Sequence, residues 1–413
     1  MLPKKKFLLV LILGLLTAIG PFSIDTYLPG FPDIARNLET TVAKISLSLS
    51  SFFIGISLGQ FLYGPLLDRF GRKKPLYIGL IVYLLATLGC SFAYSADALI
   101  TWRFFQALGS CAGLVASRAM VRDLFPVEEN AKVFSMLMLV VGLSPLLAPT
   151  SGGYLTAYFG WRSVFYLLSV MALLILVLVY FYLPESRPPD KSISLKPRPI
   201  VLGFVAVLKE PQFYTYALTG SIAAAGLYAY ISGSPYVFME IYGVSEKQYG
   251  WIFAFIAFGL ILASQVNSLL LRKYRSEQII RVALVCQSAT GILLFLGALY
   301  GFLGLYSTIF LIFIFLSCQG FTFPNSSALS LAPFTRNAGS ASAMMGGIQM
   351  ATGATTSAIV SILSNHTALP MTGVMAICST SALGILLLGG NIIRKKALSS
   401  ACEEQSVEFI STT

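Results

Sequence analysis

The chain has 413 residues, of which 56% are hydrophobic and 11% charged, with a mean hydropathy of +0.79 and a net charge of +11. Soluble domains carry roughly 25% charged residues, so this chain has too little charge to cover a soluble globule of its length. The composition therefore indicates an integral membrane protein. The basic residues stand in short runs between long apolar stretches, a distribution that argues against a nucleic-acid partner.

The N-terminal segment MLPKKKFLLVLILGLLTAIG resembles a secretory signal, but its apolar run is long and no A-x-A site follows it. We interpret it as an uncleaved first helix. A helix needs about 20 apolar residues to cross the ~30 Å hydrocarbon core of a bilayer. Twelve such stretches are predicted in chain order: 7–29, 42–67, 75–94, 98–121, 133–156, 162–183, 212–238, 247–271, 278–300, 305–331, 339–363 and 370–393.

The charges of the connecting segments test this count. With a cytoplasmic N-terminus, 22 basic residues fall on the inner side, with Arg118 in the inner half of the fourth helix left out. Because basic residues are enriched in cytoplasmic loops, the bias predicts an even number of spans and two cytoplasmic termini. The outer side holds only five basic residues: Arg36, Lys44, Arg103, Arg162 and Lys247.

The longest polar interruption divides the chain into two halves. Residues 184–211 are rich in proline and basic residues, and they read as a cytoplasmic linker between bundles at 1–183 and 212–396. Residues 397–413 form a polar tail that we expect to be disordered. The predicted fold is an all-α integral membrane protein with 12 transmembrane helices in two six-helix bundles, an arrangement that suits a carrier with its site at the midplane between the halves.

The segment GPLLDRFGRKKPLYIG, between the second and third helices, has a spacing that a plain basic loop does not require. Its glycines permit close backbone approach, and its acid can pair with the neighbouring bases and hold one conformation closed. The corresponding segment of the second half, LLLRKYRSE, keeps the bases but lacks the glycine and the acid. The first loop supplies six candidate gating residues: Gly64, Asp68, Arg69, Gly71, Arg72 and Lys73.

The fifth predicted helix contains GLSPLLAPTSGG, at 142–153. Its small residues permit tight helix contacts and its prolines bend the helix, although simple packing explains the same composition. Its candidate gating residues are Pro145, Pro149, Gly152 and Gly153.

These segments carry a family resemblance. The loop at 64–79 resembles motif A of the major facilitator superfamily. RFFQALGSCAG resembles the fourth-helix motif of its proton-coupled members, and GLSPLLAPTSGG the fifth-helix motif of its antiporters, with Ala-Pro where Gly-Pro is usual. SIDTYLPGFPDIA and RDLFPVEENAK further resemble the bicyclomycin-resistance (Bcr/CflA) branch of the drug:proton antiporters. The resemblance implies the superfamily's fold and export of drugs against protons.

A proton-coupled carrier needs an acid that titrates inside the membrane. Asp25 is the only acid within a predicted span, and a charge there costs roughly 2.5–3.5 kcal/mol, so such residues usually have a function. Arg103 lies at a matching depth, and the resemblance implies that both helices line the cavity. We predict that Asp25 and Arg103 couple proton binding to transport. The alternative is that Asp25 only caps its helix.

Aromatic and polar residues in the spans suggest an amphipathic cargo cavity. Lipid-facing aromatic belts give the same signal, and Arg118 could either attract anionic cargo or snorkel to the interface. The candidate cargo-binding residues are Tyr27, Gln60, Arg118, Tyr228, Tyr230 and Asn325.

The predicted function is proton-coupled export of small amphipathic molecules by a monomer in a bacterial inner membrane. An exporter of one metabolite or siderophore would use the same machinery, and a proton symporter is less compatible with the segment at 142–153. The sequence contains no GxSxG motif, phosphate loop or His cluster that would suggest an enzyme, and no soluble domain that would suggest a receptor. Scattered cysteines and a single histidine give no metal or disulfide pattern, so no cofactor or metal is expected.

Overall fold

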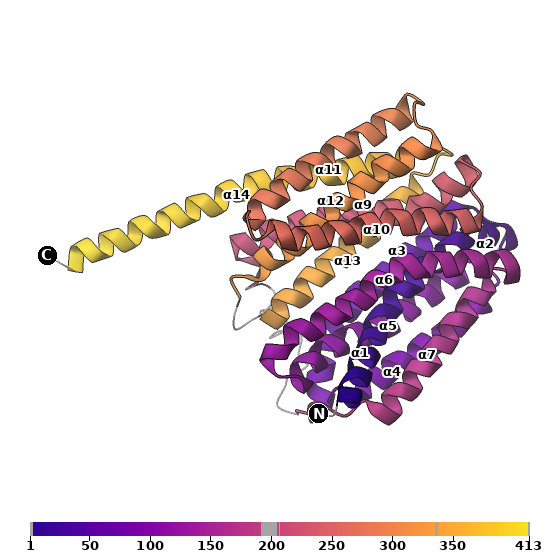
Figure 1. The fold of residues 1–413 in the computed structure, drawn as a ribbon, viewed down its shortest axis with the longest axis horizontal. Helices are drawn as coiled ribbons and strands as arrows, with labels where there is room; N and C mark the ends of the chain where they lie inside the picture. The colour runs from indigo at the N-terminus through magenta and orange to yellow at the C-terminus, as the bar shows by residue number, and fades with distance from the viewer. Residues whose placement is uncertain (1–2, 191–204, 206, 335–337, 412–413) are drawn as a thin grey trace.

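The computed structural model of the chain describes residues 3–190, 205, 207–334 and 338–411. Figure 1 shows two groups of long helices lying side by side, one from each half of the chain. Both chain termini lie at the same end of the molecule, which we call the termini end, and the opposite end is the far end.

The first bundle begins with α1, and its helices start and stop at recognisable capping residues. The hydroxyl oxygens of Thr41 and Ser95 accept hydrogen bonds from Lys44 N and Ala98 N, and so cap the starts of α3 and α5. A short 3-10 turn (Leu28–Gly30) and a short helix complete the far end. The helices are α1 (Pro3–Asp25), α2 (Phe31–Asn37), α3 (Val42–Phe70), α4 (Lys73–Ser91), α5 (Ala96–Leu124), α6 (Val127–Phe159) and α7 (Arg162–Tyr182).

The second bundle begins with α9 (Pro211–Pro235), which continues into a π-helical turn (Tyr236–Ile241) directly after Pro235. Ser245 and Gln248 form a reciprocal capping box at the start of the next helix. The remaining helices are α10 (Glu246–Leu270), α11 (Ser276–Leu299), α12 (Leu305–Leu331), α13 (Ala338–Ile362) and α14 (Leu369–Ser411).

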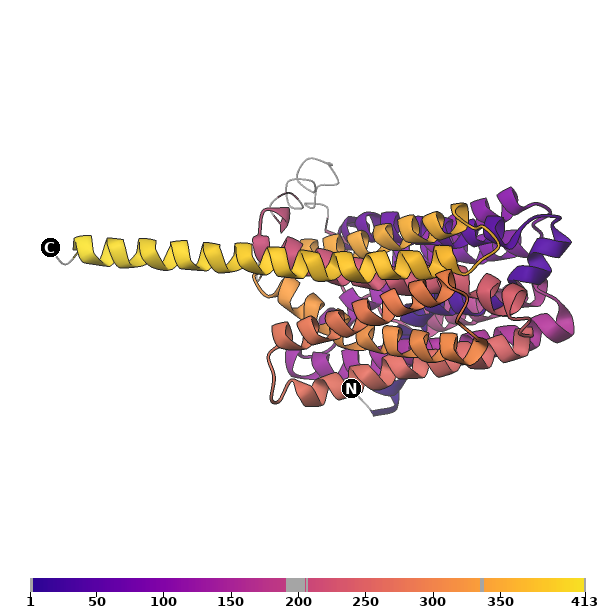
Figure 2. The same cartoon turned by 90° about the horizontal axis from the view of Figure 1, so that it is seen from above.

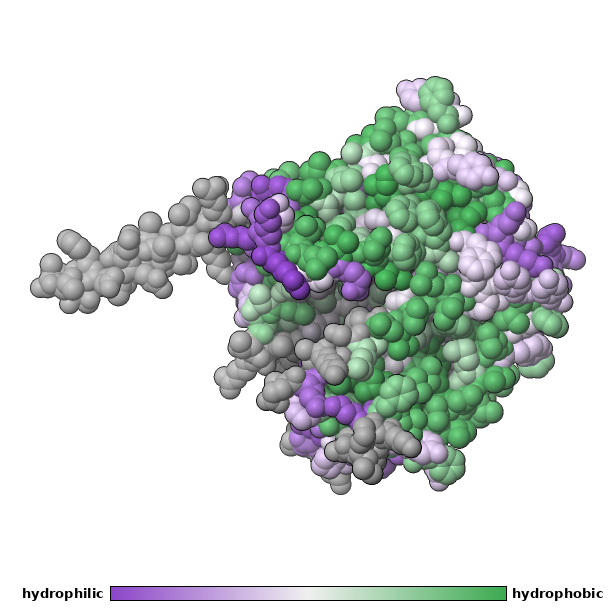
Figure 3. Space-filling view, viewed as in Figure 1, coloured by the Kyte–Doolittle hydropathy of each residue, from purple (hydrophilic) through white to green (hydrophobic). Residues whose placement is uncertain are grey.

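The twelve long helices confirm the predicted fold class, and most begin and end within a few residues of the predicted spans. Within the described residues, nine helical stretches are long and apolar enough to cross a membrane. Large apolar side chains cover the outside of both bundles, including Leu139, Phe181 and Val282, and the surface in Figure 3 is mainly hydrophobic between two more hydrophilic ends. This surface is what a lipid environment requires.

The C-terminal tail differs from its prediction. Residues 397–413 were expected to be disordered, but α14 continues to Ser411 and extends alone beyond the other helices in both views (Figures 1 and 2). The segment from Ala397 to Ser411 contains no proline or glycine to interrupt a helix, which accounts for its continuation. Most of the predicted linker, at 191–204 and 206, lies outside the described residues.

Candidate functional site

Asp25 is the only acidic residue buried in the described part of the chain, with 5% of its surface exposed. It is the last residue of α1, four residues after Pro21 in the same helix. Two tyrosines of the second bundle lie near it, Tyr230 of α9 and Tyr249 of α10. Among the described residues the Tyr230 hydroxyl has no hydrogen-bond partner, whereas Tyr249 Oη lies 2.8 Å from Ser234 Oγ. The carboxyl group therefore lies where the two bundles meet.

Arg103 does not pair with Asp25. Its guanidinium lies 4.6 Å from the Tyr27 ring centroid and 4.3 Å from that of Phe52. Its Nη1 donates to the Ser23 carbonyl (3.2 Å) and to Gln106 Oε1 (2.6 Å). No ion pair of Arg103 is found within 4.0 Å among the described residues.

The Arg103 side chain is fully buried, and its Nε and Nη2 have no hydrogen-bond partner in the described part of the chain. The two aromatic rings are therefore the main contacts that offset the free-energy cost of burying the guanidinium group, as in a desolvated cation–π contact. The expected pairing with Asp25 is not formed because matching depth in two helices does not fix the direction in which each side chain points. The structure places Arg103 in the core of the first bundle.

Tyr27 belongs to the same core. It is 1% exposed, its hydroxyl lies 2.8 Å from Ser48 Oγ, and its ring packs edge-on against Phe31 at 4.7 Å. This position differs from the predicted one on the cargo cavity. Tyr27 instead helps to hold Arg103.

The far end of α6 forms one seam between the bundles. A Cβ at Gly153 would lie 2.5 Å from the Glu246 carbonyl oxygen of the second bundle, whereas one at Gly152 would overlap the Thr26 carbonyl oxygen within the first bundle. On the other side, a Cβ at Gly250 of α10 would lie 2.7 Å from the Pro149 carbonyl oxygen. Three of the four predicted gating residues of α6 therefore lie at close backbone contacts, and Pro145 lies one turn before Pro149 in the same helix.

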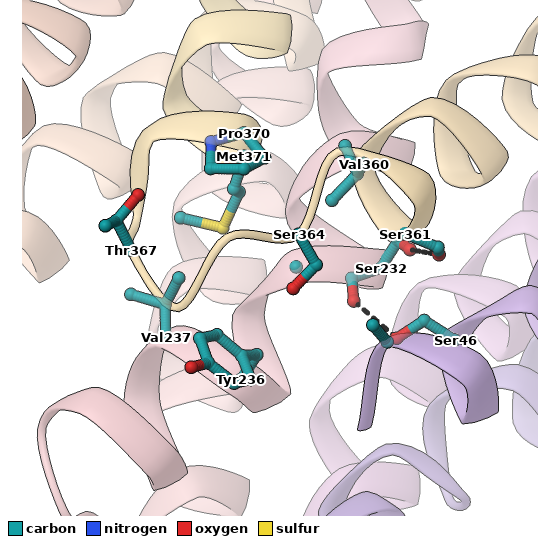
Figure 4. Close-up of a pocket in the computed structure, with 12 residues that line it drawn as sticks. Ser46, Ser232, Tyr236, Val237, Val360, Ser361, Ser364, Thr367, Pro370 and Met371 are labelled. Atoms are coloured by element: carbon teal, nitrogen blue, oxygen red, sulfur yellow. Dashed lines mark hydrogen bonds between the residues drawn. The ribbon is translucent and has the colours of Figure 1, made fainter. Parts of the chain in front are cut away.

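A second seam joins α3 to α9 and α13. Figure 4 shows its far end, where Ser46 Oγ donates to the Ser232 carbonyl oxygen at 3.1 Å and Ser232 Oγ lies 3.4 Å from Ser361 Oγ. The adjoining cavity, lined also by Tyr236 and Met371, has a volume of about 20 Å³. This space suits a water molecule rather than an organic ligand. The far end is therefore closed.

Deeper along this seam lie two predicted cargo residues. Ser57 Oγ donates to the Gly347 carbonyl oxygen (3.1 Å), and a Cβ at Gly346 would overlap Gln60 Oε1. The Tyr228 ring packs against Phe53 across the seam, with centroids 4.8 Å apart. Gln60 and Tyr228 are 8% and 7% exposed, so in this conformation they close the seam instead of lining an open cavity.

At the termini end, the loop between α3 and α4 contains a charged cluster. Arg72 Nη1 donates to Asp68 Oδ1 (2.6 Å), and Arg72 Nε donates to Asp123 Oδ2 (2.8 Å). Burial lowers the pKa of Arg72, but its bonds to Asp123 and Asp68 outweigh burial and leave the pKa raised. Arg187 Nη1 lies 3.5 Å from Asp68 Oδ1. All these partners belong to the first half of the chain.

Glu185, which the sequence did not single out, anchors the same loop. Its two carboxylate oxygens accept hydrogen bonds from the backbone nitrogens of Arg72 (2.7 Å) and Lys73 (3.1 Å). Gly71 has φ +83°, and its missing side chain leaves room for Glu185 and Arg187. A Cβ at Gly64 would meet nothing within 4 Å, and the Arg69 guanidinium lies 5.9 Å from the Phe70 ring centroid.

Arg118 of α5 has an exposed side chain, although protein atoms surround it closely. It therefore lies in a recess open to solvent. No hydrogen bond or ion pair of Arg118 occurs among the described residues. Asn325, by contrast, is buried and donates from Nδ2 to Asn267 Oδ1 at 2.6 Å, which makes it a link between α12 and α10.

The described residues contain no cluster of three or more His, Cys, Asp or Glu side chains that could hold a metal ion. The chemistry of the site is that of one buried carboxyl group at an interface.

The family model described as "Major Facilitator Superfamily" matches residues 13–357. The chain belongs to the major facilitator superfamily. It is 33% identical over 375 residues to a bicyclomycin resistance protein homolog of Haemophilus influenzae, covering 91% of this chain and 94% of the relative. It is 27% identical to a chloramphenicol resistance protein of Pseudomonas aeruginosa, covering 91% and 89%.

The fold has matches among solved structures. A bacterial homologue of the human lysosomal transporter Spinster, in an inward-facing and unoccupied conformation, superposes with a TM-score of 0.69 at 15% identity. The match covers 94% of this chain and 96% of the other, and at this identity it supports the fold alone.

Proposed function

We propose that this superfamily member exports small amphipathic organic molecules from a bacterial inner membrane in exchange for protons, with Asp25 as the proton carrier. The observation that supports the proposal best is the position of Asp25, a buried acid without an ion-pair partner among the described residues, facing the second bundle. The drug-resistance names of the two relatives support organic cargo.

The seams suggest which state of the transport cycle the molecule occupies. Close contacts join the bundles at the far end and in the middle, whereas the charged cluster at the termini end joins only segments of the first half. In the proposed orientation both termini are cytoplasmic, as the basic inner loops favour. The structure then corresponds to a state closed toward the outside, in which Arg118 lies in the recess that cargo enters from the cytoplasm.

Proton exchange follows from the surroundings of Asp25. Burial among neutral groups favours its protonated form, and opening the far-end seams would hydrate the carboxyl group and favour the charged form. The closed and open states of the far end therefore differ in their affinity for the proton. A proton bound from outside stabilises the state open to the cytoplasm. Its release into the cytoplasm requires water to reach the carboxyl group from that side as cargo is loaded, which again favours the charged form.

Reconstitution in proteoliposomes tests the proposal. With an imposed pH gradient, addition of a bicyclomycin-like or chloramphenicol-like compound should dissipate the gradient, as recorded by a pH-sensitive dye. Asp25→Asn should reduce this coupled signal at least tenfold because the amide cannot titrate, whereas Asp25→Glu should keep part of it. Asp97→Asn is the matched control, since Asp97 is exposed and pairs with Lys44 at 3.0 Å. Full coupling in Asp25→Asn would remove Asp25 from the mechanism.

A specific anionic metabolite is the second candidate cargo, and the exposed Arg118 favours it. Arg118→Gln should then weaken transport of anionic compounds at least fivefold and leave neutral drugs unaffected. Arg122→Gln, one turn further along α5, is the control. Equal loss for anionic and neutral cargo would exclude charge recognition by Arg118.

A further inference from the structure

The loop between α10 and α11 corresponds in position to the charged loop between α3 and α4, but it contains bases without the acid. Arg272, Lys273 and Arg275 are all exposed. None of them has an ion pair within 4.0 Å in the described part of the chain, unlike Arg72 in the first loop. Three basic side chains without an ion pair within 4.0 Å therefore stand at the termini end of the second bundle, with the exposed acid Glu277 two residues after Arg275.

An apolar groove begins directly beside these bases. The helices α10 and α11 each pack extensively against α12 but not against each other, so α12 forms the floor of a groove between them. Its volume is about 390 Å³, and it is lined mainly by apolar side chains. Leu270 and Tyr274 lie on one wall, Ile279 and Val282 on the other, and Cys318 and Phe321 form the floor.

The groove faces outward from the bundle. Val282 is 70% exposed, and Val285 on the same helix is 53% exposed, so this face of α11 lies against the surroundings of the bundle. Figure 3 shows a mainly hydrophobic surface over α10 and α11, with hydrophilic residues gathered at the end of these helices. The surroundings of such a surface are acyl chains.

We infer that this groove binds one anionic phospholipid of the surrounding bilayer, with an acyl chain along α11 and the phosphate against Arg272, Lys273 and Arg275. The charges match, because basic residues at the membrane surface attract anionic headgroups. Tyr274 lines the groove with an apolar ring and a polar hydroxyl, which suits the boundary between chain and headgroup. Gln278 Oε1 accepts from Arg275 N at 3.1 Å, which leaves its amide NH₂ able to donate to a phosphate oxygen.

The inference is independent of the cargo and of proton coupling. It assigns a role to a segment that the gating cluster does not use. In the first half, Asp68, Asp123 and Glu185 bind the loop to its own bundle. In the second half, the lipid headgroup supplies the negative charge instead.

Native mass spectrometry of the full-length protein in detergent tests this site, with phosphatidylglycerol and phosphatidylcholine carrying identical acyl chains. The wild-type protein should retain one phosphatidylglycerol with at least tenfold preference over phosphatidylcholine. The triple variant Arg272→Gln, Lys273→Gln, Arg275→Gln should lose that preference. The triple variant Lys4→Gln, Lys5→Gln, Lys6→Gln removes the same number of charges elsewhere and should keep it.

A second pair of variants tests the groove itself. Cys286 is exposed and lines the groove, so Cys286→Phe should fill it and reduce binding of both lipids at least fivefold. Val285→Phe places the same ring on a neighbouring exposed position outside the lining and should leave binding unchanged. Equal retention of the two lipids by the wild type, or equal loss in the two charge variants, would overturn the proposal, as would unchanged binding in Cys286→Phe. Thermal unfolding of each variant checks that it is folded.

Discussion

The first bundle buries three charged side chains, Asp25, Arg72 and Arg103, whereas no charged residue is buried in the described part of the second bundle. The polar side chains buried in the described part of the second bundle are neutral, among them Asn267, Gln287 and Asn325. Buried charge is costly, so its concentration in one half indicates a division of roles. In the proposed mechanism the first bundle supplies titration and gating, and the second supplies a neutral wall facing Asp25.

The largest effect is expected at the glycine seam between the bundles. Gly153→Val would drive its side chain into the Glu246 carbonyl of the second bundle and hold the far end apart. Transport should fall at least tenfold in proteoliposomes, while cargo binding measured by equilibrium dialysis should persist. Gly142→Val is the control in the same helix, because a Cβ there meets nothing within 4 Å. Similar losses in both variants would mean that helix propensity, not the seam, is responsible.

Substitutions at Arg103 and Asp25 should affect stability differently, because Arg103 holds the core of the first bundle and Asp25 is the proposed proton carrier. Arg103→Lys loses the planar contact with Tyr27 and Phe52 and leaves a buried ammonium group, which should lower the unfolding temperature by about 5 °C. Asp25→Asn should leave the unfolding temperature within about 2 °C of wild type, because a neutral amide replaces a carboxyl group that burial keeps protonated. Arg36→Lys, at an exposed side chain 3.9 Å from Asp33, is the control. The distinction fails if Arg103→Lys keeps full stability.

The charged cluster at the termini end should have a smaller effect. Asp68→Asn removes the ion pairs with Arg72 and Arg187 and should slow transport about threefold to tenfold, with Asp97→Asn as the control. The pKa of Arg72 is raised, so its contribution is fully present below its usual pKa and is lost only at still higher pH. The effect of Asp68→Asn should therefore be the same across pH 6–9. A strong pH dependence in that range would show that the Arg72 cluster titrates.

The smallest effect is expected in the second bundle. Asn325→Ala breaks the hydrogen bond to Asn267, and such bonds between membrane helices are worth about 0.6 kcal/mol on average. The unfolding temperature should fall by about 2 °C, with an unchanged order of cargo preference in a transport competition assay. A changed order of cargo preference would indicate that Asn325 belongs to the cargo site.

Much of this architecture could be predicted from the sequence because hydrophobic length and loop charge report directly on the bilayer. The span predicted at 305–331 coincides with α12, and the break at Gly71 follows from a backbone conformation that only glycine adopts easily. The burial of Asp25 was predictable as well, since it is the only acid inside a predicted span.

The partners of buried residues were less predictable. Depth along two helices placed Asp25 and Arg103 at the same level, but rotation about the helix axes directs Arg103 toward Phe52 and Tyr27. The role of Glu185 depends on how a distant segment returns to the loop, which no local pattern encodes. Aromatic composition also could not distinguish a packed residue such as Tyr27 from one lining a cavity.

The seam at Gly153 and Gly250 has a consequence for the speed of the cycle. Backbone atoms meet there without bulky side chains, so separating the helices exposes little apolar area and the two end states can remain close in free energy. Nearly complete switching of a two-state equilibrium requires about 5.5 kcal/mol. Because the two end states then differ little in free energy, the work available from a single ion is enough to convert either state into the other. The carrier therefore does not remain in one state with its cargo bound.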